Sequence, residues 1–143
     1  MPRVQSHILV HSMLFASDNG FRLDERMCRR VNAFIAQWHR REKHTLHAVS
    51  MEADHLHLLA QLRPSVATGA YVKKIKAAIA RWINRRHPNN RRFLWDHEWR
   101  ALSISFSRKE RERAVIFSQR RVHRHRDAHT ELAILERRSG MRR

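Results

Sequence analysis

Two histidines, His55 and His57, flank Leu56 and form the short pattern in this chain that points most directly to chemistry. Alternate side chains of a strand share a face, so both imidazoles would project together while Leu56 points into the opposite layer. Two imidazoles about 6.5–7 Å apart along one strand can converge on a single metal ion. The alternative, common in a chain with 12 histidines, is two polar residues on an open sheet face.

A β-hairpin is expected to hold this triplet. Residues 45–51 predict one strand, residues 52–54 a turn, and residues 55–62 the returning strand. The short turn favours direct antiparallel pairing of the two strands. Asp54, the last residue of the turn, leads into the triplet.

The remaining elements surround this hairpin in a regular order. Before the hairpin we expect a strand over 7–15, a turn over 17–20 and a helix with apolar residues from Leu23 to Trp38. After it we expect a helix capped by Ser65 that ends at 87–90, and a strand over 99–106. A helix from a Ser107–Glu110 capping box through Gln119 and a short amphipathic segment over 130–137 complete the chain. The order β-α-β-β-α-β followed by helices predicts an α+β, ferredoxin-like (RRM-like) antiparallel sheet with helices packed on one face. Residues 1–143 are expected to form one domain, with 139–143 as a loose tail.

The charge of the chain points to a polyanionic partner. Thirty Lys and Arg face 13 Asp and Glu, which gives a formal net charge of +17. Nucleic acid fits this excess, because neutralising phosphates releases condensed counterions. An anionic membrane surface is the rival, but no apolar run approaches the roughly 20 residues of a spanning helix. Cys28, the only cysteine, excludes an intrachain disulfide and multi-cysteine zinc modules, and fits a reducing cytoplasm.

Several residues are candidates for contact with nucleic acid. Basic side chains would hold phosphates, and a tryptophan in a polar stretch would stack on an unpaired base. The alternative for the basic helix is an ordinary solvated face. The candidates are Lys73, Lys74, Lys76, Arg81, Arg91, Arg92 and Trp95.

Five blocks of the sequence, in register from about residue 7 to 138, carry a family resemblance. They are ADHLHLLAQL around His55, KKIKAAIARWIN over 73–84, FLWDHEWRALSIS over 93–105, VIFSQRRVH over 115–123 and TELAILERRSG near the end. Together they resemble the IS200/IS605-like tyrosine transposases of the HUH superfamily and their relatives associated with bacterial repeat palindromes (REP).

The resemblance implies single-stranded DNA transposition in the bacterial cytoplasm, at the nucleoid. Members bind a DNA hairpin, and a helix-borne tyrosine attacks the neighbouring phosphodiester and forms a covalent intermediate. By position, His55, His57 and Gln119 would hold a divalent ion, Mg²⁺ or Mn²⁺, that stabilises charge on the phosphoryl oxygens. Short members pair as homodimers, with each site formed in cis or in trans.

The position of the nucleophile departs from the family pattern. The tyrosine lies four residues before the glutamine, and Val115 occupies that place. Tyr71, the only tyrosine, belongs to a different helix, where it would be a core or base-stacking residue, and Ser118 has no evident base. The sequence therefore predicts a hairpin DNA-binding protein without phosphotyrosine chemistry, and leaves enzymatic activity open. The alternatives are a metal-dependent nuclease or transposase with another nucleophile, and a general basic RNA-binding protein.

Overall fold

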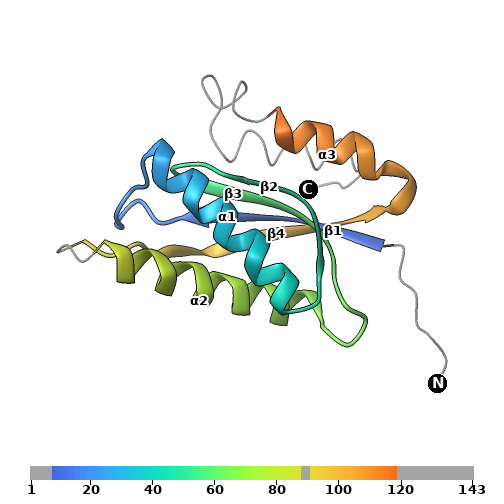
Figure 1. Ribbon diagram of the computed structural model, residues 1–143, viewed down its shortest axis with the longest axis horizontal. Coiled ribbons are helices and arrows are strands. Elements are labelled where there is room, and N and C mark those ends of the chain that lie inside the picture. Colours follow the sequence, from blue (N-terminus) through green and yellow to red (C-terminus); the bar gives the residue numbers. More distant parts are fainter. Residues whose placement is uncertain (1–7, 88–90, 119–143) are drawn as a thin grey trace.

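The computed structural model describes residues 8–87 and 91–118, and these form a four-stranded sheet with helices on both faces (Figure 1). The sheet is antiparallel, in the order β2-β3-β1-β4. The elements in chain order are β1 (Ile8–Ala16), α1 (Glu25–Arg41), β2 (Thr45–Met51), β3 (His55–Gln61), α2 (Thr68–Arg86), β4 (Trp95–Ser105), the 3-10 turn η1 (Phe106–Arg108) and α3 (Lys109–Phe117). This order and topology confirm the predicted ferredoxin-like arrangement.

The hairpin of β2 and β3 forms as expected, and β3 lies in the interior of the sheet. The amide of Glu52 donates to the carbonyl of His55 at 2.8 Å, which closes the turn. On its other side β3 pairs with β1, so that Met13 lies opposite His57 and Phe15 opposite His55. Both histidines are therefore placed in the middle of the sheet by hydrogen-bonded neighbours on each side.

Helices α1 and α2 cover one face of the sheet and enclose the larger core cluster. Leu56 and Leu58 of β3 point into this layer, where they meet apolar residues of the helices such as Ile35 and Ile79. The α1 helix begins where the side chain of Asp24 accepts a hydrogen bond from the amide of Met27 at 2.7 Å. Alternation along β3 thus sends Leu56 to the helices and the neighbouring histidines to the opposite face.

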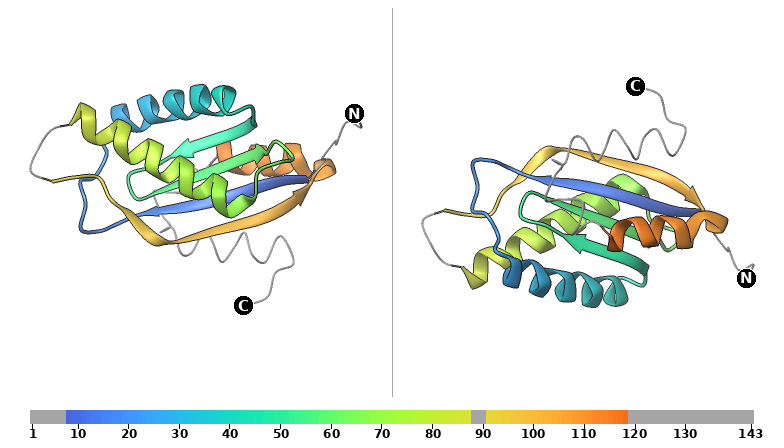
Figure 2. Two further views of the ribbon diagram at one scale, coloured as in Figure 1. Left: turned by 90° about the horizontal axis from the view of Figure 1, so that it is seen from below. Right: turned by 90° about the horizontal axis from the view of Figure 1, so that it is seen from above.

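Helix α3 lies on that opposite face, which corrects the expectation that the helices share one side of the sheet (Figure 2). It packs against β2 and β3. Its buried Ile116 joins a second, smaller cluster with Leu9, Met13, Leu59 and Ile104. The face that carries His55 and His57 is therefore partly covered by the third helix.

Several predicted boundaries differ in the structure. Ser65 does not cap α2, which begins at Thr68 with Ala67 at the N-cap position and no side-chain cap. The expected capping box at Ser107 is also wrong, because Phe106–Arg108 form a 3-10 turn and α3 begins without a side-chain cap. The β4 strand starts earlier than predicted, since Trp95 already pairs with Ala16. Gln119, the segment 130–137 and the tail 139–143 lie outside the described residues.

Within the described part of the chain, no helix has the length and apolar character needed to cross a bilayer.

Candidate metal centre and nucleic-acid interface

The two histidines of the triplet lie side by side on the same face of the sheet as α3. The side chains of His55 and His57 are buried, and their ring centres are 5.0 Å apart with the planes nearly perpendicular. Two imidazoles that bind one ion through nitrogens at roughly 2.1 Å have ring centres roughly 5 Å apart. The spacing of this pair therefore fits shared coordination of one ion.

A third ligand does not come from the acidic, histidine or cysteine residues that the structure describes. Residues 8–87 and 91–118 contain no group of three or more such side chains arranged to hold a metal. The predicted third ligand, Gln119, lies outside this range. The described donor set is thus a pair of imidazoles.

Asp54 orients one member of the pair. Its Oδ1 lies 2.6 Å from Nδ1 of His55. Histidines that bind metals commonly donate their second ring N–H to a carboxylate, which fixes the tautomer and the direction of the ring. The aspartate that precedes the triplet in the sequence therefore has the geometry expected of such a partner.

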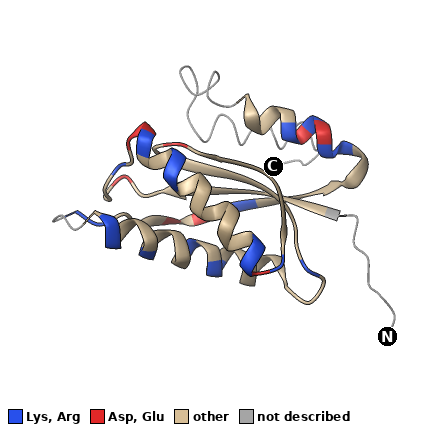
Figure 3. Ribbon diagram, in the orientation of Figure 1, with Lys and Arg blue, Asp and Glu red and all other residues tan. Residues whose placement is uncertain are grey.

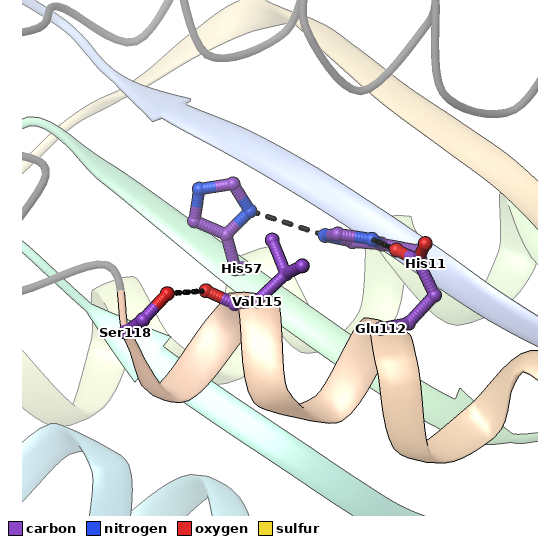
Figure 4. A network of polar contacts seen from close by, with 5 residues as sticks. All are labelled: His11, His57, Glu112, Val115 and Ser118. Carbon is purple, nitrogen blue, oxygen red and sulfur yellow. Dashed lines mark hydrogen bonds and ion pairs between the residues drawn. The ribbon is translucent and has the colours of Figure 1, made fainter.

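His57 has a different neighbour, which the sequence did not indicate. Its Nδ1 lies 3.1 Å from Nε2 of His11 on β1, and Nδ1 of His11 lies 3.2 Å from Oε2 of Glu112 on α3 (Figure 4). His11 and Glu112 are both buried. The available signals were weak: one histidine inside an apolar strand, and one glutamate four residues before the buried Ile116.

Val115 lies one helical turn after Glu112 and points toward the same two histidines. Its side chain extends from α3 toward the space between His57 and His11 (Figure 4). It is half-buried and packs against the smaller core cluster. Ser118, further along, donates its hydroxyl to the carbonyl of Val115 at 2.9 Å. The side chain that extends from α3 toward His57 and His11 at this position is therefore a hydrocarbon.

The single tyrosine lies on the far side of the sheet. Tyr71 is buried among α1 and α2 residues of the larger core cluster. Its hydroxyl lies 2.6 Å from Nε2 of His39, and burial raises the pKa of the phenol well above its usual value. Tyr71 is thus a core residue and not a base-stacking one, and it cannot reach a phosphate beside His57.

The sequence profile described as "Transposase IS200 like" matches residues 4–118. The chain belongs to the IS200-like transposase family. A crystal structure from Deinococcus radiodurans R1, described provisionally as a transposase, matches with a TM-score of 0.64 over 83% of this chain and 96% of that chain. Its sequence identity is 18%, so this likeness concerns the fold alone. No protein with a curated description matches.

This transposase-family chain also carries a basic groove between α1 and α2, on the face of the sheet opposite to His55 and His57. The groove encloses about 490 Å³. Its walls combine cationic and aromatic side chains, and Glu42 is the single acidic residue among the described residues that line it. The principal lining residues are Arg41, Lys74, Arg81, Arg85, Arg86, Phe34, Trp38 and Trp82. Figure 3 shows basic residues repeated along both helices, whereas α3 carries mixed charge.

Aromatic and cationic groups meet inside the groove. Trp82 stacks on Phe34 with ring centres 5.3 Å apart, and the guanidinium of Arg86 lies 4.1 Å from the centre of the Trp82 ring. The ammonium of Lys74 lies 2.9 Å from Glu42, so part of its charge is already neutralised. Arg81 is exposed. Such a wall of guanidinium and aromatic groups suits a phosphate backbone with unpaired bases.

The seven predicted nucleic-acid contacts do not form one cluster. Lys74 and Arg81 line the groove, whereas Lys76 is half-buried and donates to the carbonyl of Asp96 at 2.7 Å. Trp95 donates to the carbonyl of Lys76 at 2.9 Å and packs edge-on against Phe93. Both residues therefore connect α2 to β4. The other exposed candidates are Lys73, Arg91 and Arg92.

Proposed function

We propose that this member of the IS200-like family binds hairpin or single-stranded DNA and holds a divalent ion, but does not form a phosphotyrosine intermediate. The ligands would be His55, His57 and Gln119, and the ion would be Mg²⁺ or Mn²⁺. Val115 stands where the nucleophile is expected. The protein would then recognise and hold DNA ends without cutting and rejoining them.

One observation carries the proposal: Val115 extends from α3 toward the space between His57 and His11. A nucleophile for a phosphodiester needs an oxygen, sulfur or nitrogen atom, and a valine side chain has none. Tyr71 is separated from the pair by the sheet, and the hydroxyl of Ser118 is exposed and directed to a backbone carbonyl.

The proposed metal site at His55 and His57, which we call the metal seat, is supported by the spacing of the two imidazoles and by the carboxylate beside His55. When bound, a divalent ion supplies Lewis-acid polarisation of a phosphate oxygen. The residues of this chain would orient that phosphate. A nuclease that uses water in place of tyrosine is the alternative function, and the same residues would serve it.

The basic groove supports DNA binding as a positioning surface. Arg81 and Arg85 would hold phosphates of a hairpin stem, and Trp82 offers a ring beside them. Residues Lys73, Lys76, Arg91, Arg92 and Trp95 remain candidates for contacts outside the groove. We further propose one domain over residues 1–143, a homodimer, and action at the bacterial nucleoid, which light scattering and localisation of a tagged protein would test.

The central experiment restores the missing hydroxyl with Val115→Tyr. A labelled single-stranded hairpin is incubated with the variant and Mn²⁺, and covalent adducts are resolved on a denaturing gel. In the adduct the phenol oxygen forms the new P–O bond, and a deoxyribose hydroxyl leaves with a proton. We expect an adduct from Val115→Tyr, because the side chain at position 115 extends from α3 toward His57, so the new phenol would lie beside a proposed metal ligand.

Val115→Phe is the matched control, since it adds the same ring without the hydroxyl and should give no adduct. The unaltered protein should bind the hairpin and give neither adduct nor nick. A covalent adduct from the unaltered protein would overturn the proposed loss of activity. Free nicked product would favour the water-driven nuclease, and a folded, metal-loaded Val115→Tyr without adduct would contradict the assigned register.

A further inference from the structure

A buried carboxylate on α3 and a third histidine on β1 lie behind the proposed metal seat. Glu112 is 4% exposed, and its Oε2 lies 3.2 Å from Nδ1 of His11. Nε2 of His11 lies 3.1 Å from Nδ1 of His57. The three side chains therefore form a continuous polar chain from the helix, across β1, to one imidazole of the pair (Figure 4).

Glu112 is unusual among the charged residues of its helix. Glu110, Arg111 and Arg113 are exposed, whereas Glu112 turns toward the sheet. Burying a carboxylate costs free energy unless it is hydrogen-bonded. The contact with His11 offsets this cost and gives the glutamate a specific place.

With Glu112 ionised and the histidines neutral, the order of atoms along this chain assigns the protons. An ionised carboxylate only accepts, so His11 donates through Nδ1–H and carries its lone pair on Nε2. That lone pair accepts from Nδ1–H of His57, which leaves the lone pair of His57 on Nε2. Asp54 acts in the same way on Nδ1 of His55. Both histidines of the pair then have the same tautomer, with Nε2 as the metal-binding nitrogen.

We propose that Glu112 and His11 are positioning residues that fix the tautomer and ring direction of His57 for a divalent ion. This inference rests on the metal seat proposed above. Glu112 lies three residues before Val115, on the same side of α3, so the contact also fixes this helix over the histidine pair. Carboxylate partners therefore orient both histidines, one directly through Asp54 and one across β1 through His11.

Two measurements test this hydrogen-bonded chain from Glu112 through His11 to His57, which we call the relay. Mn²⁺ affinity is measured by calorimetry for the full chain and for Glu112→Gln and His11→Phe. Loss of an outer partner typically weakens metal binding about 10–100-fold, and we expect that range for both variants. Glu110→Gln, an exposed carboxylate on the same helix, is the matched control and should bind Mn²⁺ within twofold of the unaltered protein.

The second measurement needs no metal. Long-range ¹H–¹⁵N NMR of the apo protein reports which ring nitrogen carries the proton, and we expect Nδ1–H for His11 and His57. In His11→Phe, His57 should shift toward the Nε2–H tautomer, while His55, held by Asp54, keeps Nδ1–H. A buried glutamate with only a packing role would change stability and leave the tautomers unchanged.

The outcomes separate the relay from the metal seat. If Mn²⁺ binding is lost in His57→Ala but unchanged in Glu112→Gln and His11→Phe, the relay is wrong and the seat stands. Nε2–H on His57 in the unaltered apo protein also overturns the relay. If His55→Ala and His57→Ala bind Mn²⁺ as the unaltered protein does, the seat itself fails and the relay with it.

Discussion

Tyr71 and His39 form a buried hydrogen-bonded pair on the face of the sheet that α1 and α2 cover. The Tyr71 hydroxyl donates to Nε2 of His39 across 2.6 Å, and Nδ1–H of His39 donates to the carbonyl of Ile35 at 2.8 Å. Burial lowers the pKa of His39 to about 4, so the ring is neutral near pH 7 and can accept from the phenol. The only tyrosine of this transposase-family chain is thus a structural residue.

This pair predicts a pH dependence of folding. The pKa of His39 is about 4 in the folded chain and near 6.5 when exposed, so the unfolded state takes up a proton first. The stability from neutral His39 is complete above pH 6.5 and falls as the pH approaches 4, by up to about 3 kcal/mol. Urea denaturation across this range measures it.

The control is His39→Gln, which should be less stable at pH 7 and show a flatter pH profile. Some slope should remain, because burial and the charge of Arg63 also lower the pKa of His44. An unchanged slope in His39→Gln would contradict the assignment. Tyr71→Phe should leave Mn²⁺ binding intact, since the pair lies across the sheet from His57.

At the scale of elements, the start of α2 lacks the cap that the sequence suggested. Ala67 occupies the N-cap position in an extended conformation, and its methyl group cannot accept a hydrogen bond from the first amides of the helix. Ser65, two residues earlier, lies outside the capping position. The helix is held by its buried face, which includes Ile75 and Ile79, and not by its terminus.

We therefore expect Ala67→Ser to stabilise the protein by about 1 kcal/mol, because a serine at this extended position can accept from an unpaired amide. Ser65→Ala is the control and should change the free energy of unfolding by less than about 0.5 kcal/mol. Urea denaturation midpoints measure both. A decrease of about 1 kcal/mol in Ser65→Ala would show that Ser65 is the cap after all.

At the scale of the whole molecule, the two faces of the sheet are specialised differently. The α1–α2 face carries the basic groove, and the α3 face carries the histidine pair with the carboxylate of Glu112. The basic residues behind the net charge of +17 are therefore not equally available to DNA. Exposed arginines of the groove can reach a DNA backbone, while Lys76 donates a hydrogen bond within the fold. DNA held in the groove and a strand end beside His57 would lie on opposite sides of one sheet.

The groove predicts a salt dependence of DNA binding. Removing one cationic side chain that binds a phosphate of the duplex stem should reduce the slope of log K against log salt by about 0.9. Arg81→Gln with Arg85→Gln should therefore lower the slope by about 1.8 and weaken binding at all sequences alike. Fluorescence anisotropy with a labelled hairpin, at several salt concentrations, measures this.

Arg22→Gln is the matched control, because Arg22 lies outside the groove and its guanidinium is 3.6 Å from Asp18. It should leave the slope within about 0.3 of the original value. An equal reduction of the slope in this control would mean that binding follows total charge and not the groove. Full retention of the slope in the double variant would place the DNA elsewhere.

Local pattern alone determined much of the fold of this chain. Period-two alternation set Leu56 toward the helices and both histidines toward the other face, since side-chain direction in a strand follows from the backbone. The short turn at 52–54 set the β2–β3 hairpin, and the order of elements indicated the ferredoxin-like sheet. Helix starts were predicted less well, because Ser65 and Ser107 have the right residue type but stand outside the first turn.

Only the tertiary structure brought the polar chain behind the seat together. His11 and His57 are separated by 46 residues, and His11 and Glu112 by 101, so no local spacing links them. Strand pairing of β1 with β3, and the placement of α3 across the sheet, decide these contacts. The tertiary structure likewise put Tyr71 out of reach and set Val115 beside the histidines. Long-range burial, and not sequence motif, determines which polar groups meet under α3.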